Sequence, residues 1–146
     1  HKVYEDGDYF PYCPGLVPSA ADWMVEKGIK VVGHDTQAND HPLATAIGPQ
    51  RNGPILPHLE AEYKEWSGGN DWKDDFPVWE PVHNKLFSNG ILGIENVGGD
   101  LDSVTGKRVT FAFFPWNWDR GDGCIIRLVA MTDKKQAYRI ESGEAF

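Results

Sequence analysis

The spacing of apolar and polar residues near the start of the chain predicts a helix. In SAADWMVEKG, residues 19–28, Ser19 can act as an N-cap, and Asp22 lies three residues further on, as in a capping box. Gly28 follows the last turn, where helices commonly end. Trp23 falls on the apolar stripe of this helix, so we expect its ring to pack in the core.

The rest of the pattern alternates between helical and strand-like segments. Turn-forming residues dominate residues 1–18 and 67–77, which we interpret as loops, and 36–57 is a long irregular segment. The polar tail from residue 133 is expected to cover a sheet edge. Helices are expected over residues 58–66 and 81–89, and strands over 29–35, 91–97, 108–118 and 124–132. This order predicts one α/β or α+β layered domain spanning residues 1–146.

Composition and charge exclude several classes of function. The net charge of −8 argues against binding to a nucleic-acid backbone, which needs clustered Lys and Arg. No apolar run approaches the length that spans a membrane, and no signal peptide is visible, so we expect a cytoplasmic location. Cys13 and Cys124 are far apart and form no CxxC motif, so we expect free thiols rather than a disulfide.

The candidate chemistry lies in PVHNKLFSNGILGIENV, residues 81–97. A helix from His83 to Asn89 advances about 10 Å, and a strand from Ile91 to Glu95 returns about 13 Å. If Gly90 reverses the chain, His83 and Glu95 should meet in space. An imidazole and a carboxylate at one point suit a divalent metal or general acid–base catalysis. The alternative is that His83 is an ordinary surface group and Glu95 a solvated strand end.

Three segments in order resemble the cyclase family of metal-dependent hydrolases, which includes bacterial kynurenine formamidases, isatin hydrolases and certain lactamases. The segments are VEKGIKVVGHDTQAND, PVHNKLFSNGILGIENV and FPWNWDRGDGCIIRLVAM. The matching positions are 25–28 and 33–36, then His83, Leu86, Phe87, Glu95 and Asn96, then Pro115 and 127–130. The resemblance implies the swivelling β/β/α fold of this family. It also implies that His83 and Glu95 correspond to the late metal-site residues.

The early motif of this family, H-x-G-T-H-x-D-x-P-x-H, does not occur in this chain. In HDTQANDHP, residues 34–42, Asp35, Asp40 and His41 are possible ligands. However, the resemblance aligns this stretch with a strand end, His34 occupies a usually aliphatic position, and a structural role in the turn is expected for Asp35. Two ligands alone hold a catalytic metal weakly, because such sites usually use three or more protein groups. We therefore expect a second polypeptide to supply the early motif, either after cleavage of a precursor before His1 or from a separate gene.

The resemblance therefore predicts one part of an oligomeric, metal-dependent hydrolase. It implies Zn²⁺ or Mn²⁺ as the metal, held in part by His83 and Glu95, and cleavage of a C–N bond in an amide, lactam or N-formyl substrate. His41 and Trp116 are candidate substrate-lining residues, although Trp116 is more often expected to pack against a sheet. Two other classes stay open: a carbohydrate- or ligand-binding β-rich module, and a non-catalytic subunit that stabilises a partner.

Overall fold

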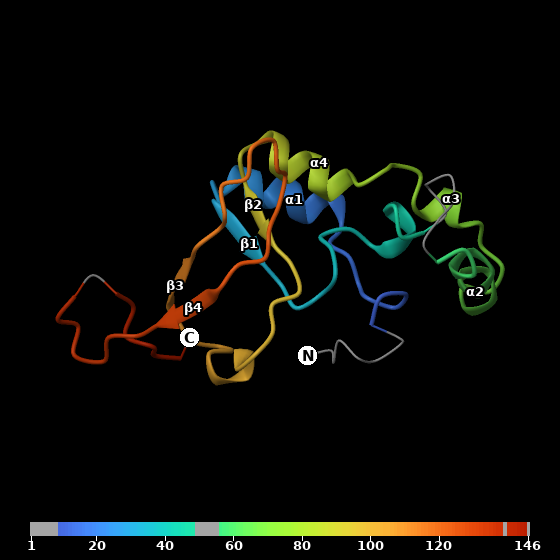
Figure 1. The fold of residues 1–146 in the computed structure, drawn as a ribbon. Coiled ribbons are helices and arrows are strands. Elements are labelled where there is room, and N and C mark those ends of the chain that lie inside the picture. Colours follow the sequence, from blue (N-terminus) through green and yellow to red (C-terminus); the bar gives the residue numbers. More distant parts are fainter. Residues whose placement is uncertain (1–8, 49–55, 139, 146) are drawn as a thin grey trace. The chain divides into compact units, whose positions relative to one another are not determined.

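The computed structural model describes all residues except 1–8, 49–55, 139 and 146 (Figure 1). The chain forms two compact units, His1–Val97 and Gly98–Phe146. Because residues 1–8 and 49–55 are not described, parts of the predicted irregular segments 1–18 and 36–57 lie outside the described residues. The organisation as a single domain stays a prediction.

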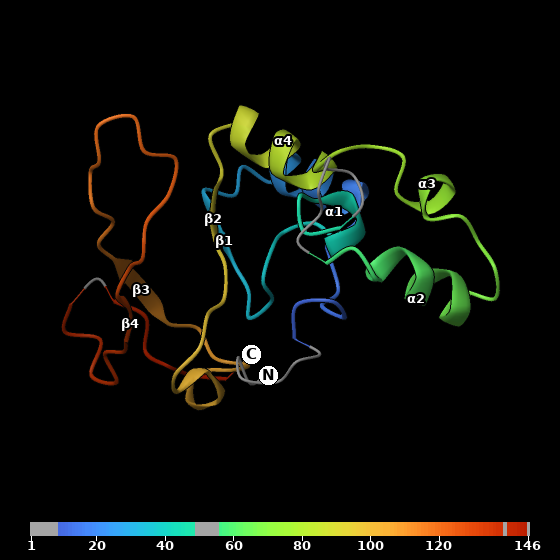
Figure 2. The same cartoon turned by 45° about the vertical axis from the view of Figure 1, so that its right-hand side comes forward.

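In the first unit, two helices pack beside a pair of parallel strands (Figures 1 and 2). β1 (Val31–Gly33) pairs with β2 (Leu92–Ile94) in parallel. α1 (Pro18–Glu26) lies alongside α4 (Pro81–Ser88), and α4 leads directly into β2. The core that joins these elements consists of Ala21, Val82, Leu86 and Ile91. Parallel strands need such a crossover connection, and here α4 is the helix that provides it.

The start of α1 differs from the prediction. The helix begins at Pro18, Val17 occupies the N-cap position, and no side chain caps the helix, so the predicted Ser19 capping box is wrong. Proline at the first position already lacks the N–H that a cap would satisfy. Trp23 is 53% exposed, so its predicted core position is also wrong. It lies two residues after the buried Ala21, which places it about 200° around the helix from the packed side.

A second group of helices surrounds a separate core. The helix predicted over residues 58–66 is confirmed as α2 (Leu59–Trp66). The 3₁₀ helix η1 (Pro42–Ala44) precedes it in the chain. A four-residue helix, α3 (Trp72–Asp75), occurs where we predicted only a loop, because the Asp71 side chain caps it by accepting the Lys73 N–H. The residues buried together are Leu43, Leu59, Tyr63 and Trp72.

The second unit is built on an antiparallel strand pair, β3 (Thr110–Phe113) and β4 (Leu128–Met131), and also contains a 3₁₀ helix, η2 (Leu101–Ser103). Both strands are shorter than predicted. The C-terminal tail pairs with residues 107 and 108, where the Arg108 N–H donates to the Glu144 carbonyl and the Gly143 N–H donates to the Arg108 carbonyl. The tail therefore pairs with the residues just before β3, and its predicted role in covering a sheet edge stays a prediction.

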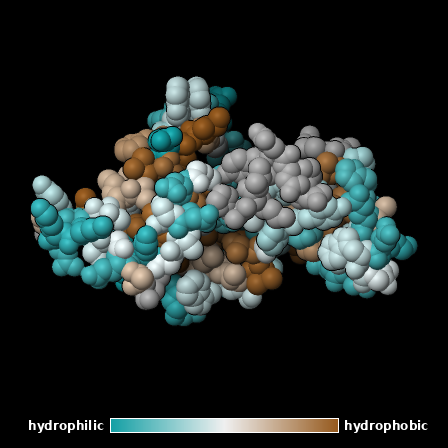
Figure 3. All heavy atoms as spheres, turned by 90° about the horizontal axis from the view of Figure 1, so that it is seen from below, coloured by the Kyte–Doolittle hydropathy of each residue, from teal (hydrophilic) through white to brown (hydrophobic). Residues whose placement is uncertain are grey.

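Large hydrophobic side chains reach the surface in both units. In the second unit, Phe114 is 68% exposed and Ile125 is 92% exposed. On the face of the molecule that Figure 3 shows, hydrophobic residues form separate patches between hydrophilic ones. Along the part of the second unit that the structure describes, every residue is at least partly exposed.

The structure tests three of the general expectations. The mixed α/β class is confirmed, whereas the specific swivelling arrangement of the cyclase family stays a prediction. Cys13 and Cys124 form no disulfide, as expected. Within the described ranges, no helix combines the length and apolar character needed to cross a bilayer.

Candidate functional site

A histidine in the first turn of α4 meets the glutamate that follows β2. His83 Nε2 lies 3.0 Å from Glu95 Oε1. The chain reverses between them at Gly90, whose φ is 70°. The Ile91 N–H donates to the Leu86 carbonyl, which completes a Schellman motif at the end of α4. The predicted reversal of the chain is therefore observed, and it brings these two side chains into hydrogen-bond contact.

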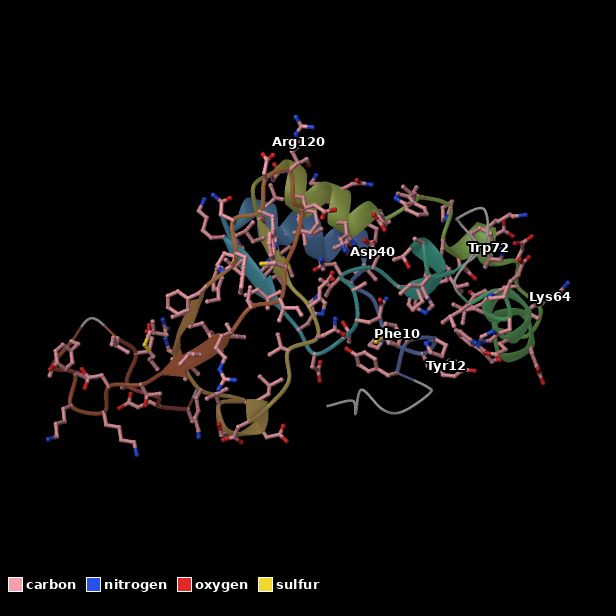
Figure 4. The ribbon with its side chains drawn as sticks, in the orientation of Figure 1. Phe10, Tyr12, Asp40, Lys64, Trp72 and Arg120 are labelled. Carbon is pink, nitrogen blue, oxygen red and sulfur yellow. The ribbon has the colours of Figure 1, made fainter. Side chains whose placement is uncertain are left out.

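A third residue, Asp40, contacts the other ring nitrogen of His83. Figure 4 labels Asp40, which lies near the start of α4. Asp40 Oδ2 lies 2.6 Å from His83 Nδ1 and also accepts the His83 backbone N–H at 2.9 Å. Asp40 Oδ1 accepts the Val82 N–H at 3.0 Å. Glu80, the N-cap by position, makes no side-chain cap bond. The buried Asp40 carboxylate thus caps α4 from a distant part of the chain and orients the ring of His83.

Glu95 is held by its own partner, the buried Asn39. Both the backbone N–H and the side-chain Nδ2 of Asn39 donate to Glu95 Oε1, at 2.9 and 3.0 Å. Beyond Asn39, His34 Nε2 lies 3.1 Å from Asn39 Oδ1. Thr36 Oγ1 lies 2.7 Å from His34 Nδ1. The loop after β1 therefore supplies a layer of polar groups behind the pair formed by His83 and Glu95.

The contacts shift the pKa values of the pair in opposite directions. Burial alone would lower the pKa of His83, but the hydrogen bonds and charges of Asp40 and Glu95 outweigh it and raise the pKa to about 9. Burial alone would raise the pKa of Glu95, but hydrogen bonds from His83 and from the Asn39 backbone lower it. At neutral pH the metal-free chain therefore holds an imidazolium ion between two carboxyl groups. Such perturbed pairs are typical of functional sites and also of structural ion pairs.

The two predicted substrate-lining residues have local packing roles. His41 Nδ1 accepts the Leu43 N–H at the start of η1, and its ring stacks on Phe76 with centroids 4.5 Å apart. Burial lowers the pKa of His41 to about 4. Trp116, in the second unit, is 67% exposed and stacks on Trp118 at 5.2 Å, so the expectation that it packs against a sheet is wrong. A substrate-lining role for either residue stays a prediction.

The spacing of His83 and Glu95 fits two ligands of one metal ion. Metal–nitrogen and metal–oxygen bonds of about 2.1 Å that meet near a right angle separate the two ligand atoms by about 3 Å. The contact of Asp40 with His83 Nδ1 also matches the carboxylate that commonly supports a metal-binding histidine. However, the described residues contain no group of three or more His, Cys, Asp or Glu side chains that could hold a metal ion. The described residues alone therefore do not complete a metal centre, and metal binding by His83 and Glu95 stays a prediction.

The first part of the chain matches a known protein family. Residues 1–41 match the family model described as Putative cyclase. This agrees with the resemblance at positions 25–28 and 33–36 and includes Asn39 and Asp40, whereas His83 and Glu95 lie beyond the matched range. No curated protein and no solved structure matches the chain.

Sequence reasoning considered Asp40 only as a possible metal ligand, not as a cap for the helix or a partner of His83, and did not consider Asn39. A signal for a distant cap was present at the start of α4. Pro81 opens the helix, and the preceding residue is Glu80 rather than Ser, Thr, Asp or Asn. A helix that begins without a local cap has backbone N–H groups to satisfy, so an acidic residue elsewhere in the chain was to be expected.

Proposed function

We propose that this chain is one part of a metal-dependent hydrolase of the cyclase type, which cleaves the C–N bond of an amide, lactam or N-formyl substrate. The observation that carries the proposal is the 3.0 Å contact between His83 Nε2 and Glu95 Oε1. The buried Asp40 carboxylate contacts the other ring nitrogen of His83, and the buried Asn39 donates to Glu95. Support also comes from the family match over residues 1–41.

In this proposal His83 and Glu95 contribute two ligands to a Zn²⁺ or Mn²⁺ ion. A bound divalent ion would polarise the substrate carbonyl and make a water molecule acidic enough to attack at neutral pH. A second polypeptide carrying H-x-G-T-H-x-D-x-P-x-H completes the ligand set. Asp40 keeps the His83 ring in place through Nδ1, so that Nε2 faces the ion.

In this proposal, His83 must lose a proton before it can bind a metal ion. In the metal-free chain His83 Nε2 carries a proton that it shares with Glu95 Oε1. That proton must leave before Nε2 can act as a ligand, because metals bind the neutral imidazole. Glu95 is already ionised in this environment and needs no such step.

The test begins with the polypeptide and the metal that co-purify with the chain, identified by mass spectrometry. The complex is then assayed against a panel of N-formyl aromatic amines and lactams. His83→Ala and Glu95→Ala should remove most of the activity and lower the metal content. His58→Ala, a change at an exposed histidine that makes no cap bond, is the matched control and should retain both. Unchanged turnover in both site variants, or full activity of the chain without any partner, would refute the proposal.

A non-catalytic stabilising subunit is the second candidate. It is favoured by the fact that His83 and Glu95 already satisfy each other as an ion pair without a metal. The metal content of the complex separates the two functions. Glu95→Gln keeps the volume of the side chain and removes its charge. If this subunit is only structural, the variant should leave the metal content unchanged.

A further inference from the structure

We propose that Asn39 is a positioning residue for Glu95, and that His34 determines which end of the Asn39 amide faces the carboxylate. The inference rests on the proposed function, because it assigns a role in presenting Glu95 to a metal. It concerns residues that the predicted ligand set does not include. His34 stands where the resemblance leads us to expect an aliphatic residue.

The orientation of the amide follows from the donors and acceptors. An ionised Glu95 can only accept, so the Asn39 group that faces it at 3.0 Å must be the NH₂. Asn39 Oδ1 then faces His34 Nε2 at 3.1 Å, so Nε2 must carry the hydrogen. The other ring nitrogen, His34 Nδ1, lies 2.7 Å from the Thr36 hydroxyl, which is also 3.3 Å from the Ala38 carbonyl oxygen. The hydrogens between His34 Nε2 and Glu95 thus have one consistent arrangement.

This network engages one oxygen of Glu95. Glu95 Oε1 accepts from the Asn39 backbone N–H, from Asn39 Nδ2 and from His83 Nε2. Within the described part of the chain, every hydrogen bond of Glu95 ends on this oxygen. Rotation of the carboxylate would break the contacts with Asn39. Asn39 therefore fixes the orientation of the Glu95 carboxylate beside His83 Nε2.

The packing of β2 makes room for this contact. A Cβ atom at Gly93 would lie 2.9 Å from Asn39 Nδ2 and 3.4 Å from the Phe87 ring. Gly93 has no positive φ, so alanine is compatible with its backbone. Gly93→Ala should therefore displace the Asn39 amide while leaving every donor and acceptor in the sequence.

The first measurement needs no partner and no metal. In the isotope-labelled chain, a scalar coupling across the hydrogen bond should connect Asn39 Nδ2 to the Glu95 carboxylate carbon. His34→Leu, which removes the donor to Asn39 Oδ1, should weaken or abolish this coupling. His34→Gln retains an N–H donor and should restore it. Absence of the coupling in the wild-type chain would overturn the inference.

The second measurement is the affinity for Zn²⁺, by competition with a chelator, for the chain together with any partner that co-purifies. Asn39→Leu should weaken binding about 10- to 100-fold, the usual effect of losing a group that supports a ligand. Gly93→Ala should weaken binding in the same direction, and it also serves if Asn39→Leu fails to fold. Asn70→Leu is the control, because the Asn70 amide also donates to a carboxylate, that of Asp75, away from the site.

The outcomes separate this inference from the proposed function. Wild-type affinity in both Asn39→Leu and Gly93→Ala would overturn the positioning role. If the wild-type protein takes up no zinc, the metal-dependent function falls, and the coupling measurement alone decides whether Asn39 holds Glu95.

Discussion

Replacing Asp40 by asparagine should destabilise the first unit substantially, although the two side chains have nearly the same shape. The Asp40 carboxylate accepts three hydrogen bonds, from the Val82 N–H, the His83 N–H and His83 Nδ1. An asparagine offers one oxygen and one NH₂ group to these donors. Whichever way the amide is turned, its NH₂ group must face an N–H group, and the negative charge beside the imidazolium is lost.

The expected magnitude comes from two contributions. Loss of a helix cap costs about 1 kcal/mol, and loss of a buried hydrogen bond to a charged group costs about 2 kcal/mol, giving about 3 kcal/mol in the free energy of unfolding. For a chain of this size, that lowers the melting temperature by about 6–12 °C. The penalty should become smaller above pH 9, because His83 is then neutral in the wild-type protein as well.

The assay is urea denaturation at pH 7 and at pH 9.5, with unfolding monitored by tryptophan fluorescence and circular dichroism. Asp22→Asn is the control, because Asp22 forms an exposed ion pair with Lys85, and such pairs contribute less than about 1 kcal/mol. If Asp40→Asn is as stable as Asp22→Asn at pH 7, then Asp40 neither caps α4 nor holds a charged His83, and the electrostatic account of the site is wrong.

Further predictions concern pH, metal uptake and the chain reversal. Because the pKa of His83 rises from 6.5 to about 9 on folding, its contribution to stability is complete below pH 6.5 and disappears as pH rises through 9. The free energy of unfolding, measured by urea denaturation across this pH range, should therefore fall by at most about 3 kcal/mol, and by less in His83→Gln. The pKa of His41 falls to about 4 on folding, so stability should decrease as pH drops from 6.5 to 4, and an unaltered slope in His41→Asn would contradict this. In the metal-binding complex, the apparent Zn²⁺ affinity should rise about tenfold per pH unit between pH 7 and 9, because His83 must lose a proton to bind. Calorimetry in buffers of different ionisation enthalpy should detect the released proton. An affinity that is independent of pH would exclude His83 as a ligand. Gly90→Ala should cost about 1 kcal/mol because φ is 70° there, whereas Gly123→Ala, at an open position without a positive φ, should be neutral, and equal stabilities would show that the turn tolerates a side chain.

The local pattern of the sequence was sufficient to predict the contact at the centre of the site. A proline at the start of α4, a glycine at its end and a short apolar strand afterwards define a helix, a reversal and a return, all within seventeen residues, 81–97. Such features are encoded by neighbouring residues, because capping and turn conformation depend on interactions over a few positions. The meeting of His83 with Glu95 followed from helix and strand geometry together with a chain reversal at Gly90, which the structure shows.

The groups that hold this pair in place were decided only by the tertiary structure. Asp40 reaches His83 across 43 positions, and Asn39 reaches Glu95 across 56. No periodicity relates residues at these separations, because the contacts exist only once β1 and β2 pair in parallel and bring the loop after β1 beside the end of β2. The same reason explains the error at Trp23, since an apolar stripe indicates which residues are apolar, while the side of α1 that is buried depends on where α4 packs.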